Sequence, residues 1–482
     1  MVDLWPVETS PVTLDGERLT AAGLAAIAGG ASATLDPAAR DRMETSARRV
    51  ASQGHGDVLR RKWAWLAGNP PQSGEASIVG EFLRGHCAAV GDPLPPEIVR
   101  ATLAARINVF ATGASGVRPE LALHLLALLA TGPMPSVPSQ GPVGAAGSAV
   151  LAHLAREALG AFEPTEKEAL SLINGSTLDT AMAALAVTRA ERLLVAAEAA
   201  AGLSFEVMEA DLGCLSPLAH AARRHPGPIA TAERLRSRCA GSELVIRRPS
   251  PDSFSIRCAP AVLGAAGEAL DHTRAVVERE LNAAADNPLV FPEEAEWVEA
   301  GNFHGAPVAL AMDHLKIALT QVAGIAERRI FRLTYGQLSG LPSFLVPGDG
   351  LLNGLMLAQY TAASLVSECK GLSHPASVDS IPTVQHLEDH VSMGTIASKS
   401  ALHLVELVAD VIAIELLCAA QGLDFRLSGE TGAGPVAPRA PGAGNRTTYE
   451  AVRRHVPRWR EDRVLHPDLV AMGRAVRAGA FR

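Results

Sequence analysis

The chain has 482 residues, of which 48% are hydrophobic, 4% aromatic and 20% charged, and its formal net charge is −8. This acidic balance argues against nucleic acid or an anionic membrane surface as a partner. Six cysteines are scattered without a CxxC pair, so neither a metal site nor a disulfide framework is indicated. No signal peptide and no uncharged apolar run of about 18 residues is visible, so the expected location is the cytoplasm.

The first 200 residues are predicted to be almost entirely helical, after a short extended segment at Val12-Thr13-Leu14. Asp36-Pro37 marks one helix start, because aspartate is a good N-cap and proline suits the first helical position. Apolar residues that recur every three or four positions predict helices over 19–29, 36–52, 77–90, 95–111, 117–131, 148–161, 164–172 and 177–200.

Two stretches interrupt this helical pattern. Residues 53–80 are weakly periodic and rich in Gly, Asn and Pro, which is typical of loops. They surround one short basic helix with the sequence Arg60-Arg61-Lys62-Trp63-Ala64-Trp65. The second stretch runs from Pro133 to Gly147 and ends in Ala145-Ala146-Gly147. Three such small residues allow the backbone to fold closely on itself.

The second half of the chain contains the longest predicted helices, at about 259–286, 304–332, 351–370 and 393–421. The last two are apolar nearly all round, as expected inside a bundle or at a subunit interface. The fold class is therefore all-α with a central bundle of long helices. We expect three parts, namely an N-terminal helical domain (1–205), the bundle domain (206–427), and a Gly/Pro-rich connector with C-terminal helices (428–482).

Short motifs with polar and glycine residues stand along almost the whole chain. They are His86-Cys87-Ala88-Ala89-Val90-Gly91, Gly141 to Gly147, Asn174-Gly175-Ser176, Ser255-Ile256-Arg257-Cys258-Ala259-Pro260, Asp286-Asn287-Pro288, Gly301-Asn302-Phe303-His304, Leu341-Pro342-Ser343-Phe344-Leu345, Glu388-Asp389-His390-Val391-Ser392-Met393 and Ala420-Gln421-Gly422-Leu423-Asp424. In this order the motifs resemble the aromatic amino acid ammonia-lyase family, which includes the histidine and phenylalanine ammonia-lyases. The resemblance implies the all-α, fumarase/aspartase-like ammonia-lyase fold. It also implies a homotetramer whose active sites each draw residues from three chains.

In that family an Ala-Ser-Gly triad cyclises to an electrophilic methylidene-imidazolone ring, which makes the substrate's amine a better leaving group. The glycine nitrogen attacks the alanine carbonyl, and the serine then loses its hydroxyl. The matching residues here are Ala145, Ala146 and Gly147. Because Ala146 has no hydroxyl to lose, we expect no ring and predict no cofactor. The triad is interpreted as a degenerate cofactor loop.

Other positions of the family's active site are also replaced. A segment that begins Tyr-Gly-x-Asn, whose tyrosine acts as a base, has no counterpart between the 36–52 helix and His86. The family's second active-site tyrosine matches Phe254, which cannot donate or accept a proton. A family glutamine matches Pro251, and the Asn-Gln pair that supports the ring matches His386-Leu387. A reaction through the usual electrophile is therefore not expected.

Three retained residues suggest that a pocket survives. Arg257 matches the family arginine that holds the substrate carboxylate, and its planar fork suits that task; a surface or interface ion pair is the alternative. Asn174 matches a residue that contacts substrate or ring, and the alternative is a helix N-cap. Glu415 lies on an otherwise apolar helix, where a lone buried carboxylate would have a raised pKa and could act as acid or base. Its alternative is a structural hydrogen bond inside the bundle.

Two histidines and two phenylalanines complete the predicted site. His86 matches a family histidine near the substrate, and the alternative is a hydrogen-bonded core histidine. His386 is a new titratable group at a family active-site position and could take over proton transfer, unless it only packs or bonds to Asp389. Phe303 and Phe254 are expected to form an apolar wall of the substrate site or, alternatively, ordinary core.

Two hypotheses for the function follow. The first is a ring-independent enzyme on an amino-acid-like substrate with a carboxylate. It would perform an acid–base elimination of the C–N lyase type, or a related addition, cyclisation or isomerisation. Ergothionase is the precedent within the superfamily, because it lacks the ring and eliminates trimethylamine, an activated leaving group, from a betaine. The second hypothesis is a catalytically inactive homologue that binds a ligand or serves as a partner subunit of an active paralogue.

Overall fold

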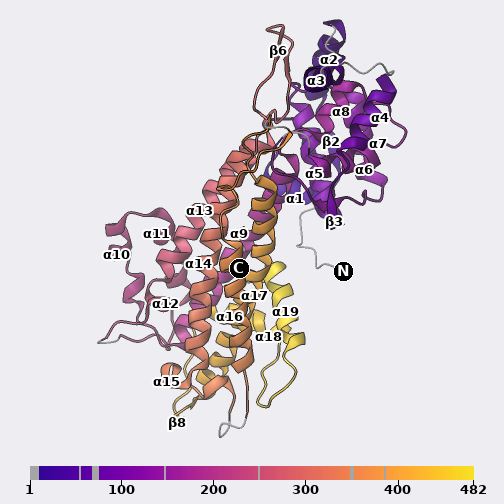
Figure 1. Ribbon diagram of the computed structural model, residues 1–482. Coiled ribbons are helices and arrows are strands. Elements are labelled where there is room, and N and C mark those ends of the chain that lie inside the picture. Colours follow the sequence, from indigo (N-terminus) through magenta and orange to yellow (C-terminus); the bar gives the residue numbers. More distant parts are fainter. Residues whose placement is uncertain are drawn as a thin grey trace.

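The computed structural model describes residues 10–53, 56–67, 75–145, 148–247, 250–347, 352–384 and 387–481. Short helices from the first third of the chain gather at one end of a bundle of long helices (Figure 1). Such an arrangement agrees with the predicted all-α class. The described strands are two to four residues long and form four separate two-stranded pairs.

The N-terminal helices begin where the sequence signals predicted. The Asp36 side chain accepts hydrogen bonds from two amides of the next turn, and Thr165 forms a capping box with Glu168, so free amides at both helix starts are satisfied. The helices of this group are α1 (Ala21–Ala28), α2 (Pro37–Ser52), α3 (Val58–Ala67), α4 (Glu75–His86), α5 (Pro96–Ala111), α6 (Pro119–Thr131), α7 (Ala149–Leu159) and α8 (Glu166–Ile173).

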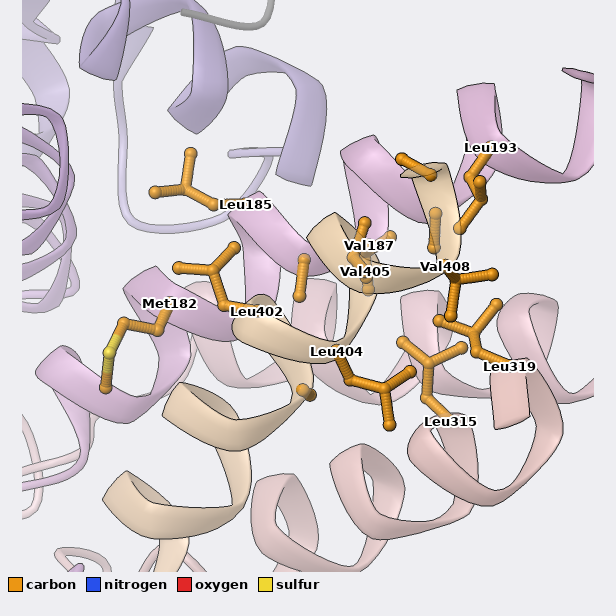
Figure 2. Packing of buried hydrophobic residues seen from close by; sticks show 14 of the residues in the cluster. Met182, Leu185, Val187, Leu193, Leu315, Leu319, Leu402, Leu404, Val405 and Val408 are labelled. Atoms are coloured by element: carbon orange, nitrogen blue, oxygen red, sulfur yellow. The ribbon is translucent and has the colours of Figure 1, made fainter. Parts of the chain in front are cut away.

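The bundle is built around α9, α14 and α17, which pack against one another along their lengths. Figure 2 shows side chains of the three helices meeting in one apolar core, with Leu404 of α17 pointing toward Leu315 and Leu319 of α14. These leucines are fully buried. The long helices are α9 (Thr177–Val207), α13 (Ala259–Leu281), α14 (Ala306–Thr334), α16 (Met356–Leu372) and α17 (Gly394–Ser428).

Shorter elements flank the bundle. The helical ones are η1 (Leu212–Leu215), α10 (Pro217–Arg223), α11 (Pro226–Arg238), α12 (Phe254–Arg257), α15 (Gly336–Ser339), η2 (Ser343–Leu345), α18 (Ala443–His455) and α19 (His466–Arg477). The strand pairs are β1 (Val12–Leu14) with β2 (Ala33–Leu35), β3 (Val90–Pro93) with β4 (Pro138–Gln140), β5 (Leu289–Phe291) with β6 (Glu296–Val298), and β7 (Glu430–Thr431) with β8 (Gly434–Pro435).

Two features differ from the expectation. Residues 177–205 are expected from sequence to join the N-terminal helices, yet α9 runs through the bundle and packs mainly on α17. The Gly/Pro-rich stretch after α17 is not a loose connector, because Glu430 pairs with Arg458 and Arg460. In the same stretch, the Gly442 amide donates to Glu206. Long-range polar contacts hold this stretch where local composition suggested flexibility.

Two stretches of helix, Glu166–Val207 and Ala306–Thr334, are long and apolar enough to cross a membrane by length and composition alone. The most apolar window of the first is completely buried inside the protein, and that of the second is 56% buried. Core helices of a folded domain pass the same test, so the two stretches are only weak support for a membrane span.

Candidate functional site

The loop that carries the degenerate triad is attached to the first residues of two bundle helices. The Gly144 carbonyl accepts hydrogen bonds from the Gly305 amide at 3.1 Å and from Ser392 Oγ at 2.6 Å. The Val143 carbonyl accepts from the Met393 amide at 2.8 Å. Gly305 and Met393 are the N-cap residues of α14 and α17. Gly144 has a φ of +77°, and a side chain there would overlap Ser392, so this position requires glycine.

A third long helix, α9, begins beside the same loop. Asp179 in its first turn accepts a hydrogen bond from Thr395 in the first turn of α17. Its second carboxylate oxygen lies next to Gly305 and Gly394. The positive ends of three helix dipoles therefore meet at the loop, an arrangement that favours a negatively charged group of a ligand. Burial raises the pKa of Asp179 to about 7, although the Thr395 hydrogen bond partly opposes the rise.

Replacing Asp179 by asparagine is expected to change how stability depends on pH. The folded pKa of about 7 lies above the ordinary aspartate pKa of 3.8, so between these values the folded chain binds more protons than the unfolded chain. The wild type therefore loses stability as pH rises from about 4 to 7, by on the order of 4 kcal/mol. Asp179→Asn removes that loss. Chemical denaturation at several pH values measures the difference, and parallel curves for both proteins would contradict the assignment.

A cavity of about 400 Å³ opens directly beside the loop. Its walls come from α3, α4, the loop, the start of α7 and residues 383–384 and 387–388. Most of the lining is apolar, and its polar side chains are Lys62, His86, Ser148, Thr383 and Glu388. A concave apolar space with a few converging polar groups is typical of a small-molecule site. We call this space the loop cavity.

His86, a predicted site residue, lines the loop cavity at the end of α4. Its Nδ1 lies 2.8 Å from the Phe82 carbonyl. Because a carbonyl can only accept, Nδ1 carries the proton and Nε2 is left as the proton-accepting atom of the neutral ring. Burial lowers the pKa of His86, and the Lys62 charge lowers it further, against the opposing effect of Glu388. The ring is thus kept neutral, as a general base requires.

Lys62 is a cavity residue that the sequence-based prediction did not select. It lies on α3, whose first amides, those of Leu59 and Arg60, donate to the Glu166 carboxylate. Leu59 and Lys62 are three residues apart and therefore share one face of the helix, which lines the cavity. Burial lowers the pKa of Lys62, with Glu388 and Glu299 opposing the shift. One sequence feature could have pointed to Lys62. It lies between the 36–52 helix and His86, where the resemblance places a tyrosine that this chain lacks.

Asn174 and Phe303 lie at the same end of the bundle. The residue before Asn174, Ile173, accepts the hydrogen bond of the Ser148 amide that follows the loop. Asn174 ends α8 instead of capping α9, so the predicted N-cap alternative is wrong. Its amide nitrogen donates to the Asn287 carbonyl at 2.7 Å, and this bond fixes the side chain. Phe303 is partly buried, two residues before the N-cap of α14.

Arg257 and Phe254 lie at the opposite end of the bundle. Both belong to α12 and are exposed, Phe254 by 69%. The Arg257 guanidinium stacks over the Phe254 ring at 4.8 Å. Among the described residues no ion pair of Arg257 is found. A cation that stands on the surface beside an aromatic ring is available to a ligand or to a second protein chain.

Glu415 is not the lone carboxylate that its apolar helix suggested, so that expectation is wrong. Its oxygens face Arg329 of α14 in a two-pronged pair, with Nε to Oε1 at 2.5 Å and Nη2 to Oε2 at 2.9 Å. Ser204 of α9 donates a further hydrogen bond to Oε1. Glu415 and Arg329 are fully buried. The carboxylate therefore ties the three central helices together, which was the structural alternative.

The predicted site residues thus fall into two groups within one chain. Glu415 is 21 residues beyond Gly394 on the continuous helix α17, which places it about 30 Å from the loop. Arg329 also contacts the Ser255 carbonyl of α12, so Arg257 belongs to this distant end. His86 and Ala145 line the loop cavity. His386, Ala146 and Gly147 lie outside the described residues.

Comparison with known proteins identifies relatives over nearly the whole chain. The family model described as aromatic amino acid lyase matches residues 70–163 and 152–454. Histidine ammonia-lyase of Anaeromyxobacter dehalogenans strain 2CP-C is 41% identical over 511 residues, which cover 97% of this chain and 99% of that protein.

Solved structures show the same similarity. Histidine ammonia-lyase from Trypanosoma cruzi shares 36% identity with a TM-score of 0.85, over 98% of this chain and 94% of that one. Ergothionase from Treponema denticola, solved with desmethyl-ergothioneine sulfonic acid, superposes with a TM-score of 0.85 over 98% of this chain and 99% of that one. Its identity is 23%, so this likeness concerns the fold alone.

Proposed function

Because the chain belongs to the aromatic amino acid lyase family, we propose that it is an enzyme of the C–N lyase type that works without the methylidene-imidazolone ring. Its substrate is an amino-acid-like molecule with a carboxylate. Relatives about 41% identical are named histidine ammonia-lyase, which supports cleavage of a carbon–nitrogen bond. The replacement of the triad serine by Ala146 removes the hydroxyl from which the ring would form.

The observation that carries the proposal is the loop cavity. It keeps a neutral histidine, His86, whose Nε2 can accept a proton. The convergent helix N-termini at the loop offer a favourable potential for a carboxylate or for negative charge that develops during proton removal. A neutral histidine in the apolar wall of a cavity is a typical candidate for proton transfer.

A complete site needs a second copy of the chain. Arg257 is the candidate for binding the substrate carboxylate, yet within one chain it lies at the far end of the bundle from the loop cavity. In an antiparallel assembly of bundles, the Arg257 end of one protomer lies beside the loop of another. The proposed homotetramer therefore unites Arg257 with the loop cavity across a subunit boundary.

An exposed apolar stripe on α14 supports this assembly. Leu310, Ile317, Gly324 and Phe331 are spaced by seven residues and therefore follow one face of the helix. Leu310 is 61% exposed, Ile317 45% and Phe331 39%. A side chain added at Gly324 would meet no atom within 4 Å. Such a stripe in water is typical of a helix–helix interface between chains. We call it the α14 stripe.

The proposed reaction can be tested with compounds of known chemistry. The full-length protein is incubated with histidine, phenylalanine and tyrosine, and with the trimethylammonium betaines of these amino acids. Elimination produces a conjugated acid, which is followed by its near-ultraviolet absorbance and by mass spectrometry. The betaines are expected to react and the free amino acids are not, because a quaternary amine leaves without an electrophile. If none of the six compounds reacts or binds, the inactive-homologue hypothesis is favoured.

The purified protein is expected to lack the near-ultraviolet absorbance of the methylidene-imidazolone ring. The Ala146→Ser variant restores the Ala-Ser-Gly order and is expected to gain that band, since the hydrogen bonds of Val143 and Gly144 that hold the loop are unchanged. Difference spectra of the native proteins measure the effect, with Ala146→Val as a control that adds side-chain bulk without a hydroxyl. A ring band in the wild type would overturn the ring-independent proposal.

A further inference from the structure

We propose that Lys62 is the catalytic base of the loop cavity and takes the part that a tyrosine plays in other members of the family. The inference deepens the proposed function and rests on it. Two observations carry it, namely the place of Lys62 in the cavity wall and the way in which α3 is held there.

The position of Lys62 is fixed by a buried carboxylate. Glu166 Oε2 accepts from the Leu59 and Arg60 amides at 2.9 and 3.2 Å, and its Oε1 accepts from Arg60 Nε at 3.2 Å. Glu166 is itself 1% exposed. A carboxylate at the first turn of a helix satisfies free amides and complements the helix dipole. This anchor orients α3 so that Lys62 lines the same cavity as His86.

The chain contains few lysines, so a lysine in the wall of a cavity is an informative observation. Only five of its 43 Lys and Arg residues are lysines, so arginine supplies nearly every surface cation. Lys167 and Lys316 are buried in ion pairs with Asp286 and Asp313, and Lys370 and Lys399 are exposed. Lys62 differs from these four in that it lines the loop cavity. Arginine cannot give up its proton in a protein, whereas a buried lysine can.

The charged groups around Lys62 define its titration. Glu388, which closes the cavity from the segment after α16, and Glu299, which follows β6, stabilise the protonated amine. His86 faces it from α4 and is affected by its charge. Burial outweighs the two carboxylates and lowers the pKa of Lys62 below that of an ordinary lysine. More of the amine is then neutral near neutral pH, and a neutral amine is a base.

The step that follows is a proton transfer coupled to elimination. The lone pair of Lys62 Nζ takes the β-proton of the substrate, and the C–H electron pair becomes the new C=C bond. The C–N electron pair leaves with the amine, which departs neutral from the quaternary nitrogen. The Lys62 ammonium then releases the proton to solvent, and this restores the neutral amine. No oxidant, metal or electrophilic ring enters this balance.

The first test measures Lys62 without any substrate. The native full-length protein is labelled with trinitrobenzenesulfonate across a pH series, and peptide mass spectrometry gives the rate at each lysine. The exposed Lys370 and Lys399 serve as internal controls. The labelling midpoint of Lys62 is expected to lie below theirs, because burial lowers the pKa of its amine. A midpoint equal to or above that of Lys370 overturns the proposal, whatever the turnover results are.

The second test separates proton transfer from charge. Lys62→Met keeps the length of the side chain without its amine, Lys62→Arg keeps the charge but cannot deprotonate, and Lys370→Met is the control. With the betaine that reacts best, both Lys62 variants are expected to lose about 10²–10⁴-fold in kcat. In the wild type, kcat/KM is expected to rise with pH because Lys62 must lose its proton to act as a base. This rise is expected to disappear in Lys62→Arg. Lys370→Met is expected to retain wild-type kinetics.

The outcomes distinguish this inference from the proposed function. If Lys62→Arg keeps kcat while Lys62→Met only raises KM, Lys62 binds the carboxylate as a charge and the catalytic role is overturned. If the wild type turns over and Lys62→Met is unimpaired, the proposed function stands and Lys62 is excluded. If the wild type has no activity while Lys62 is labelled at a lower pH than the exposed lysines, the proposed reaction fails. The assignment of a lowered pKa to the Lys62 amine is then kept.

Discussion

Glu415→Gln is expected to lower the free energy of unfolding by about 3–5 kcal/mol, because it leaves Arg329 as an uncompensated buried charge. The substitution preserves the shape of the side chain and its bond from Ser204. It removes the negative charge of the carboxylate, whose Oε1 lies 2.5 Å from Arg329 Nε and whose Oε2 lies 2.9 Å from Arg329 Nη2. Denaturation with guanidinium chloride at constant protein concentration measures the change.

Two variants control this result. Glu191→Gln breaks the half-exposed pair with Arg274 and is expected to cost less than about 1 kcal/mol, because solvent screens such pairs. The double variant Glu415→Leu with Arg329→Met removes both buried charges and is expected to recover most of the lost stability. If Glu415→Gln instead retains full stability and loses only turnover, Glu415 acts in catalysis and its structural assignment is wrong.

Introducing aspartate at both Leu310 and Ile317 is expected to dissociate the protein. At an interface each apolar side chain contributes about 1.5–3 kcal/mol through burial, and a carboxylate in its place must be desolvated without a partner. In an isologous interface both chains contribute the same surface patch, so each such interface contains the substituted residues twice. Light scattering is expected to give a tetramer for the wild type and smaller species for the double variant.

The matched control is Leu218→Asp on α10. Leu218 is also an exposed leucine, at 84%, but it lies outside the α14 stripe, so no change in mass is expected. Helical content measured by circular dichroism should be the same in all three proteins. A monomeric wild type, or a double variant that keeps the wild-type mass, would rule out the α14 stripe as the interface. It would also remove the route by which Arg257 reaches the loop cavity.

Local signals in the sequence were enough to predict the helical fold. The Asp36 cap and the apolar periodicity of α14 and α17 depend on residues within about four positions of one another. Such signals can be recognised without knowing which distant segments meet in space. The family resemblance and the missing hydroxyl of Ala146 are likewise properties of the residues themselves. Neither the prediction of helices nor the prediction that no ring forms required tertiary information.

The chemical state of the site residues was decided by tertiary packing alone. Glu415 looked unpaired because its partner, Arg329, is 86 residues away, on a helix that reaches it only when α14 and α17 pack together. In the sequence Lys62 is only one cation of a short basic helix. Its place in the wall of the loop cavity depends on the anchoring of α3 by Glu166, which is 106 and 107 residues away from the amides it binds. Charge, burial and proximity decide which groups can exchange protons, and each of these depends on distant segments meeting in space.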